Sequence, residues 1–102
     1  MAEATGLIEK IKLAQDGDQH AFRYLLEFFW NDVYGFMLQR TKNENEAEDL
    51  TIRSFGKAFE KIMTYNEAYG FKTWLTTIAK NLNIDEIRKK TNANFTTESS
   101  QI

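Results

Sequence analysis

The 102-residue chain is 42% hydrophobic and contains no Pro, no Cys and one His, His20. This composition suits one helical domain with a modest core and excludes disulfides, thiolate zinc sites and histidine clusters, so we expect no metal or other cofactor. The formal net charge of −2 argues against general nucleic-acid binding. However, residues 1–50 carry five Lys and Arg against ten Asp and Glu, and residues 51–102 carry eight against five, so phosphate binding is expected in the second half.

Two helices are predicted in the first half of the chain. The first has Leu7, Ile11 and Ala14 on one stripe and is predicted to end near Gly17. Asp18 can cap the second, which is predicted to continue to about Arg40. The apolar positions of the second helix are spaced for one buried face: Phe22, Leu25, Leu26, Phe29, Val33, Phe36 and Met37.

A polar break at residues 41–45 precedes a third predicted helix, where Asn45 and Glu48 resemble a capping box. Its core face is predicted to contain Ala47, Leu50, Phe55, Ala58 and Ile62. Ile52, Gly56 and Phe59 lie elsewhere on the cylinder, so this helix is either wrapped on both sides or docks a partner. Gly56 costs the helix about 1 kcal/mol relative to Ala. Either close packing against a neighbouring helix or a docked partner would explain why a glycine stands there.

A loop at residues 64–70 then leads to the fourth predicted helix. The loop contains Tyr65, Asn66, Glu67 and Tyr69, a mixture that can stack and hydrogen-bond a flipped base. An ordinary loop whose Tyr rings cover the core has the same composition, and composition alone favours it. The apolar face of the fourth helix comprises Phe71, Trp74, Leu75, Ile78 and Leu82.

Five cations stand within 20 residues beside this loop: Lys72, Lys80, Arg88, Lys89 and Lys90. They suit a groove for single-stranded DNA, and a solvated helix face explains them equally well. The last three also suit the end of a helix, because cations stabilise the negative end of its dipole.

The fold class that follows is all-α: a compact bundle of three long helices plus a short N-terminal helix, formed by residues 1–90. Residues 91–102 are polar and lack periodicity, which predicts a linker or a disordered tail. No Gly-rich phosphate loop, nucleophile elbow or paired His motif occurs, so we expect no enzymatic activity. Without a signal segment or an apolar run of bilayer length, the chain is expected to be cytoplasmic, with no membrane insertion.

Two strings resemble region 2 of the extracytoplasmic-function (ECF) sigma factors of bacterial RNA polymerase. Residues 47–59 begin Ala-Glu-Asp-Leu and resemble the family's polymerase-docking helix. Residues 71–90 carry Thr-Trp-Leu, Ile-Ala-Lys-Asn and Asp-x-x-Arg at the spacing of its promoter-element helix. The resemblance covers about residues 7–90. It implies the sigma factor region 2 fold and a transcription initiation factor that binds the polymerase core and recognises and melts the promoter −10 element by capturing non-template single-stranded DNA.

The resemblance also implies roles for individual residues. The surface that docks on the β′ clamp coiled coil would comprise Asp49, Leu50, Ile52, Arg53 and Gly56. The residues that hold a flipped base would be Tyr65, Asn66, Glu67 and Tyr69. Those lining the path of the non-template strand would be Lys72, Lys80, Asn81 and Arg88. Trp74 is expected in the core, because it shares a stripe with Ile78.

The chain departs from the family pattern at two places. Ile52 and Arg53 stand where the family usually has Gln-Glu, and Asn66 and Glu67 replace a common Arg-Gly, so the preferred base is not transferable. The family's second domain, a helix-turn-helix that reads the −35 element, has no counterpart after Lys90. An anti-sigma factor is a further partner that the resemblance leaves open. The alternative function is a helical protein-interaction module, an adaptor or antagonist of the transcription machinery, that binds no DNA.

Overall fold

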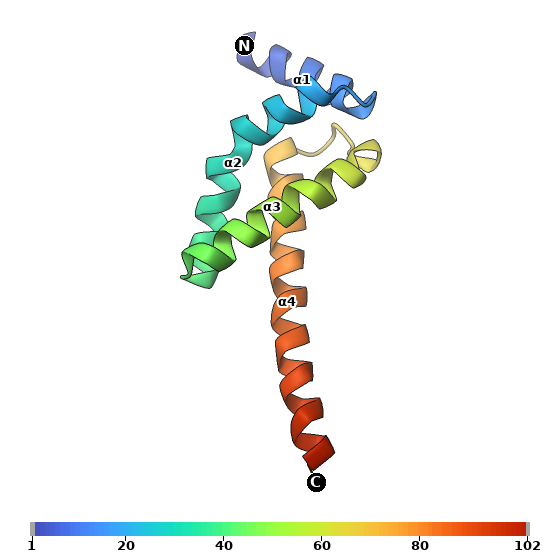
Figure 1. Ribbon diagram of the computed structural model, residues 1–102. Helices are drawn as coiled ribbons and strands as arrows, with labels where there is room; N and C mark the ends of the chain where they lie inside the picture. The colour runs from blue at the N-terminus through green and yellow to red at the C-terminus, as the bar shows by residue number, and fades with distance from the viewer. Residues whose placement is uncertain (1, 102) are drawn as a thin grey trace.

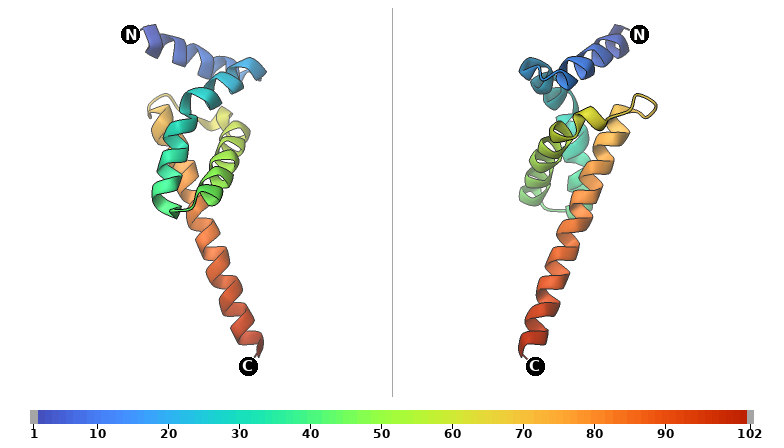
Figure 2. Two further views of the ribbon diagram at one scale, coloured as in Figure 1. Left: turned by 60° about the vertical axis from the view of Figure 1, so that its left-hand side comes forward. Right: turned by 90° about the vertical axis from the view of Figure 1, so that its right-hand side faces the viewer.

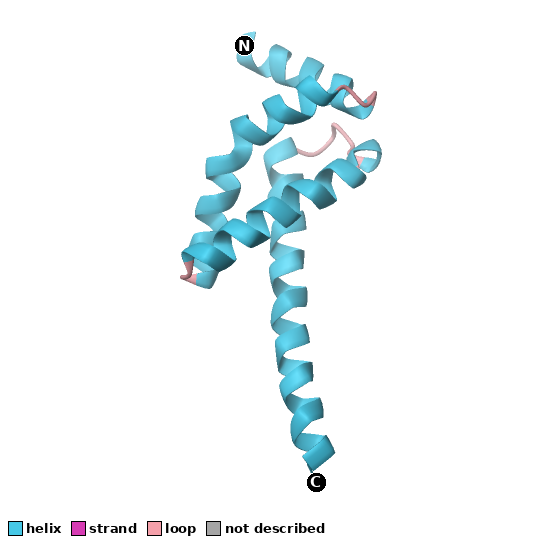
Figure 3. Ribbon diagram, viewed as in Figure 1, coloured by secondary structure: helices cyan, strands magenta, loops and turns pink. Residues whose placement is uncertain are grey.

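The computed structural model describes residues 2–101 and the side chains of residues 6–91. Its helices are α1 (Ala2–Gln15), α2 (Gln19–Thr41), α3 (Glu44–Glu60), the short 3-10 helix η1 (Ile62–Thr64) and α4 (Phe71–Gln101), with no strand over residues 2–101. In Figure 1, α2, α3 and the first half of α4 form the bundle, α1 lies across one end, and α4 projects beyond the other. Only short loops connect the helices (Figure 3), so the predicted all-α class is confirmed.

The boundary between α1 and α2 follows the local sequence signals. Gly17 has a φ of 92°, the left-handed conformation that ends a helix and that glycine adopts without strain. Asp18 then caps α2, and its side chain accepts a hydrogen bond from the backbone N–H of Ala21 at 3.1 Å. Both predicted signals are confirmed.

The predicted cap of α3 was two residues too late. Asn43, not Asn45, caps this helix, and its Oδ1 accepts from the backbone N–H of Glu46 at 3.0 Å. The reason lies in Lys42, which takes a left-handed φ of 55° and ends α2 with a bond from its N–H to the Leu38 carbonyl at 2.8 Å. The chain therefore turns within one residue, and the next residue, Asn43, is already the extended residue that a cap requires.

The predicted end of the fourth helix at Lys90 was also wrong, because α4 continues to Gln101. No Gly or Pro follows Lys90. The Thr, Asn and Ser residues there lower helix propensity by only about 0.5–0.7 kcal/mol each, so nothing in this segment stops a helix already under way. Ile102 and the side chains of residues 92–101 lie outside the described part of the chain, and a linker role for this segment stays a prediction.

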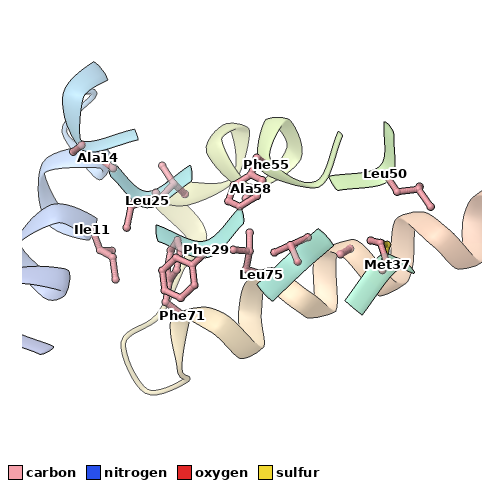
Figure 4. Close-up of a cluster of buried hydrophobic side chains, with 14 of the residues drawn as sticks. Ile11, Ala14, Leu25, Phe29, Met37, Leu50, Phe55, Ala58, Phe71 and Leu75 are labelled. Atoms are coloured by element: carbon pink, nitrogen blue, oxygen red, sulfur yellow. The ribbon is translucent and has the colours of Figure 1, made fainter. Parts of the chain in front are cut away.

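The core runs along the middle of the bundle (Figure 4). Phe29 of α2 packs against Phe71 of α4 with ring centroids 5.3 Å apart, and Phe55 of α3 stacks on Trp30 at 6.1 Å. On α4 the buried apolar residues are Phe71, Leu75 and Ala79. The predicted core positions that are only partly buried lie at its edge: Leu7, Phe22, Leu26, Phe36, Trp74, Ile78 and Leu82.

No helix over residues 2–101 combines the length and the apolar character that crossing a bilayer requires.

Candidate functional site

The exposed face of α3 carries an unusual apolar surface. Ile52 is 55% exposed, and a Cβ built at Gly56 would meet no atom within 4 Å. Close packing against a neighbouring helix therefore does not explain Gly56. Of the apolar residues outside the core face, only Phe59 is engaged within the described bundle, with its ring 4.7 Å from that of Phe22. The surface around Ile52 and Gly56 is left open to a partner.

Four of the five predicted docking residues share this open face, and one does not. Asp49, Ile52 and Gly56 are exposed, and Arg53 is half-buried beside them. Leu50 is only 3% exposed and packs in the core, so its predicted contact with a partner is corrected. Leu50 lies on the same side of the helix as Ala47, Ser54 and Phe55, all of which are buried. It supports the open face of α3 from beneath.

Arg53 joins α3 to α4. Its Nη1 lies 3.3 Å from Oδ2 of Asp49, one turn earlier on α3, and 3.4 Å from Oε2 of Glu86 on α4. Arg53 therefore lies at the edge of the open face of α3 and also contacts α4. The sequence did not reveal the contact between Arg53 and Glu86, because these two residues are 33 positions apart in the chain.

Two more polar contacts tie the same stretch of α4 to the bundle. Nε of Arg40 donates to Oδ1 of Asn83 at 2.8 Å, and Nζ of Lys90 lies 2.9 Å from Oε1 of Glu46. The hydrogen bond to Glu46 is the main cause of the raised pKa of Lys90, followed by the charge of Glu46. We call these two contacts and the Arg53–Glu86 pair the polar seam. The seam lines a groove of about 230 Å³ between α2, α3 and α4. After Ala79, α4 is held against the bundle by the polar seam together with partly buried apolar residues such as Leu82.

The loop before α4 is ordered around Tyr65. The Tyr65 ring packs against Phe71 at 5.1 Å and Trp74 at 5.2 Å, and its hydroxyl donates to the Tyr69 carbonyl at 2.5 Å. Burial, and to a smaller extent the charge of Glu67, raise the pKa of Tyr65 above its ordinary value, so the hydroxyl keeps its proton. The simpler prediction, a loop whose Tyr ring covers the core, therefore holds for Tyr65.

The other three loop residues face outward in different ways. Oδ1 of Asn66 accepts from the backbone N–H of Ala68 at 2.9 Å, which forms a turn and uses one end of the amide. Glu67 lies across from α1, with Oε1 4.0 Å from Nζ of Lys12. Tyr69 is 66% exposed, the most open aromatic side chain among those described.

A pocket of about 310 Å³ lies between this loop and α1, at the end of the bundle where Figure 2 shows the two together. At its C-terminal end, α1 is tied to η1 by Gln15, whose Nε2 donates to the Ile62 carbonyl at 3.1 Å. The pocket is lined by Leu7, Ile8, Ile11, Tyr65, Glu67, Ala68, Tyr69, Gly70 and Phe71. Asn66 is outside it. The α1 wall was not predicted, although the position of Ile8 off the core stripe is a signal for it.

The predicted cations Lys72, Lys80 and Arg88 follow one another along α4 and are here called the cationic row. Lys72, Lys80 and Arg88 are spaced by eight residues, which places them about 12 Å apart along the helix and turns each about 80° further around it, so the row winds around α4. All three are exposed, and Lys72 lies 3.7 Å from Asp32 of α2. Within residues 6–91, neither Lys80 nor Arg88 is ion-paired. Asn81, seven residues before Arg88 and on the same side of α4, lines a groove with Lys57 of α3 and with Lys61, which follows α3.

Residues 29–93 match the family described as sigma-70 region 2. The chain belongs to this family. The match begins within α2, includes α3, the loop and the cationic row of α4, and leaves α1 outside it.

Individual relatives agree with the family match. The ECF RNA polymerase sigma factor SigW of Bacillus subtilis is 37% identical over 82 residues, which are 80% of this chain and 44% of that protein. The ECF RNA polymerase sigma factor BldN of Streptomyces coelicolor is 32% identical over 88 residues, which are 85% of this chain and 33% of that protein. The predicted resemblance to ECF sigma factors is therefore confirmed. The chain spans less than half the length of these two relatives.

Proposed function

We propose that the chain is the part of a transcription initiation factor that binds the polymerase core and melts the promoter −10 element by holding non-template single-stranded DNA. The family match supports this role. The observation that carries it is the pairing of two open surfaces on one small bundle: the Ile52–Gly56 face of α3, and the loop pocket that leads to the cationic row of α4.

Docking on the polymerase would use the open face of α3, against the clamp coiled coil of β′. An exposed Ile beside an exposed Gly gives a partner both apolar area and room for close backbone approach. Ile52→Asp should therefore abolish most binding, because it buries an unpaired carboxylate at the interface, while helix content stays unchanged. A pull-down with core polymerase and a circular dichroism spectrum measure the two effects.

DNA capture would use the pocket and the row together. A flipped base would enter the pocket between the loop and α1, where aromatic and aliphatic side chains can stack on it, and the flanking phosphates would follow Lys72, Lys80 and Arg88. The polymerase, and not this domain, would catalyse RNA synthesis.

A photoreactive side chain at Tyr69 separates this function from a protein-interaction module that binds no DNA. Tyr69 is exposed at the pocket mouth, so the label should crosslink to one position of the non-template strand in a polymerase complex. The same label at Glu44, exposed at the first residue of α3, is the control and should not reach that position. If the Tyr69 label crosslinks only to polymerase, the interaction module is the better description.

A further inference from the structure

The hydrogen-bonding groups of the loop pocket are few and differ in kind. Among its lining side chains, only Tyr65, Glu67 and Tyr69 carry polar atoms. The Tyr65 hydroxyl donates its proton to the Tyr69 carbonyl, so it can only accept from a ligand. The Tyr69 hydroxyl can rotate to donate or accept, so it excludes no base. The carboxylate of Glu67 is the only charged group among these lining side chains, and it has no donor.

The Glu67 carboxylate is only weakly neutralised. Its contact with Lys12 is 4.0 Å long, and both side chains are more than half exposed, at 59% and 63%. Pairs of this kind interact weakly in water. One carboxylate oxygen and most of the lone pairs of the other stay available to a ligand.

An ionised carboxylate accepts hydrogen bonds and donates none. Cytosine, adenine and guanine each carry an exocyclic amino group that projects from the ring and donates to such an acceptor. Thymine has no amino group, and its single donor, N3–H, lies between two carbonyl oxygens that a carboxylate repels. A thymine carbonyl facing Glu67 would bring two acceptors together without a proton between them. The carboxylate therefore favours the three bases that carry an amino group over thymine.

We propose that Glu67 makes this pocket select a nucleobase with an exocyclic amino group and reject thymine at the flipped position. This inference rests on the proposed promoter-melting function and adds the chemical class of the base that the pocket takes. Of the two polar residues at the tip of the loop, it assigns base reading to Glu67 and not to Asn66, because Asn66 lies outside the pocket and its Oδ1 accepts from the N–H of Ala68.

The test is a selection from a pool of single-stranded oligonucleotides with random bases, using the 102-residue chain bound to bacterial core polymerase. At one position of the selected pool, thymine should be depleted roughly tenfold, the effect of one charge-assisted hydrogen bond. Glu67→Gln should restore thymine at that position alone, because the new amide can donate to a thymine carbonyl.

Glu60→Gln is the matched control, since it removes the same charge from an exposed residue that does not line the pocket. It should leave the selected base composition as in the parent chain. If the pool shows selected positions but thymine is tolerated at all of them, or if Glu67→Gln changes no position, the inference about Glu67 is overturned and the promoter-melting function stands. If no position is selected by any variant, the proposed function fails and the inference fails with it.

Discussion

Arg53 of α3 lies 3.4 Å from Glu86 of α4, and the same guanidinium reaches Asp49 at 3.3 Å. One side chain thus borders the proposed polymerase-docking face and also holds the helix that carries the cationic row. A partner that bound Asp49 or Arg53 would act directly on the polar seam. Docking at this face would therefore also engage a side chain that holds α4.

The Arg53–Glu86 pair is partly exposed, so its contribution to stability should be small but measurable. A double-mutant cycle with Arg53→Ala and Glu86→Ala should give a coupling free energy of about 0.5–1 kcal/mol that shrinks in high salt. Chemical denaturation measures it. A cycle with Asp49→Ala in place of Glu86→Ala is the control, and this pair within one helix should couple by about 0.3–0.5 kcal/mol. A zero coupling for Glu86 would contradict the seam.

Gly56→Ala should separate stability from docking. The added methyl group meets no atom of the described chain, so the helix should gain up to about 1 kcal/mol in stability. Binding to core polymerase should weaken, because a closely approaching partner has no room for the methyl group. Gly35→Ala is the matched control on α2, also exposed and with nothing within 4 Å of the new Cβ. It should give a similar gain and leave polymerase binding intact. Equal binding by both variants would exclude close approach at Gly56.

Trp74→Ala should destabilise the domain by about 2–4 kcal/mol, at or below the usual cost of truncating a Trp, because Trp74 is only partly buried. Its ring supports Tyr65 and Phe71, so the loop pocket should loosen as well. Tyr69→Ala removes an exposed ring of the same pocket and should leave the thermal midpoint nearly unchanged while weakening DNA capture. A parent-like melting curve for Trp74→Ala would show that Trp74 belongs to the surface.

Lys80→Ala should reduce the salt dependence of single-stranded DNA binding by roughly one unit of slope, with a similar loss for every sequence. Fluorescence anisotropy at several salt concentrations measures this slope. Lys42→Ala, at the exposed α2–α3 turn, is the control and should leave the slope close to that of the parent. Loss of affinity with an unchanged slope would mean that Lys80 contacts no phosphate.

The local signals in the sequence predicted local structure well. Asp18 and Gly17 acted as expected, because a cap and a left-handed glycine depend on their immediate neighbours. The cap of α3 was misplaced because nothing in the sequence indicates that Lys42 takes a positive φ. The predicted end of α4 was wrong because polar composition alone does not end a helix, and residues 91–101 contain no Gly or Pro that would.

The site was predicted only in part, because much of it depends on contacts between distant residues. The resemblance supplied the loop and α3, but the α1 wall of the pocket, formed by Leu7, Ile8 and Ile11, lies more than 50 residues away in the chain. The inward orientation of Leu50 follows from its place in the packed core. The Arg53–Glu86 contact likewise depends on how α4 packs, which periodicity does not reveal.

The most direct test of the account compares three DNA forms bound to the chain on core polymerase: a −10 non-template strand, its complementary strand, and the duplex of the two. Fluorescence anisotropy should show the tightest binding for the non-template strand, because the pocket can take an unpaired base without first breaking a pair. The Ile52→Asp variant, which should not load on polymerase, controls for binding by the core enzyme itself. Equal affinity for the three forms, or the same preference with Ile52→Asp, would contradict the proposal that this domain captures melted promoter DNA.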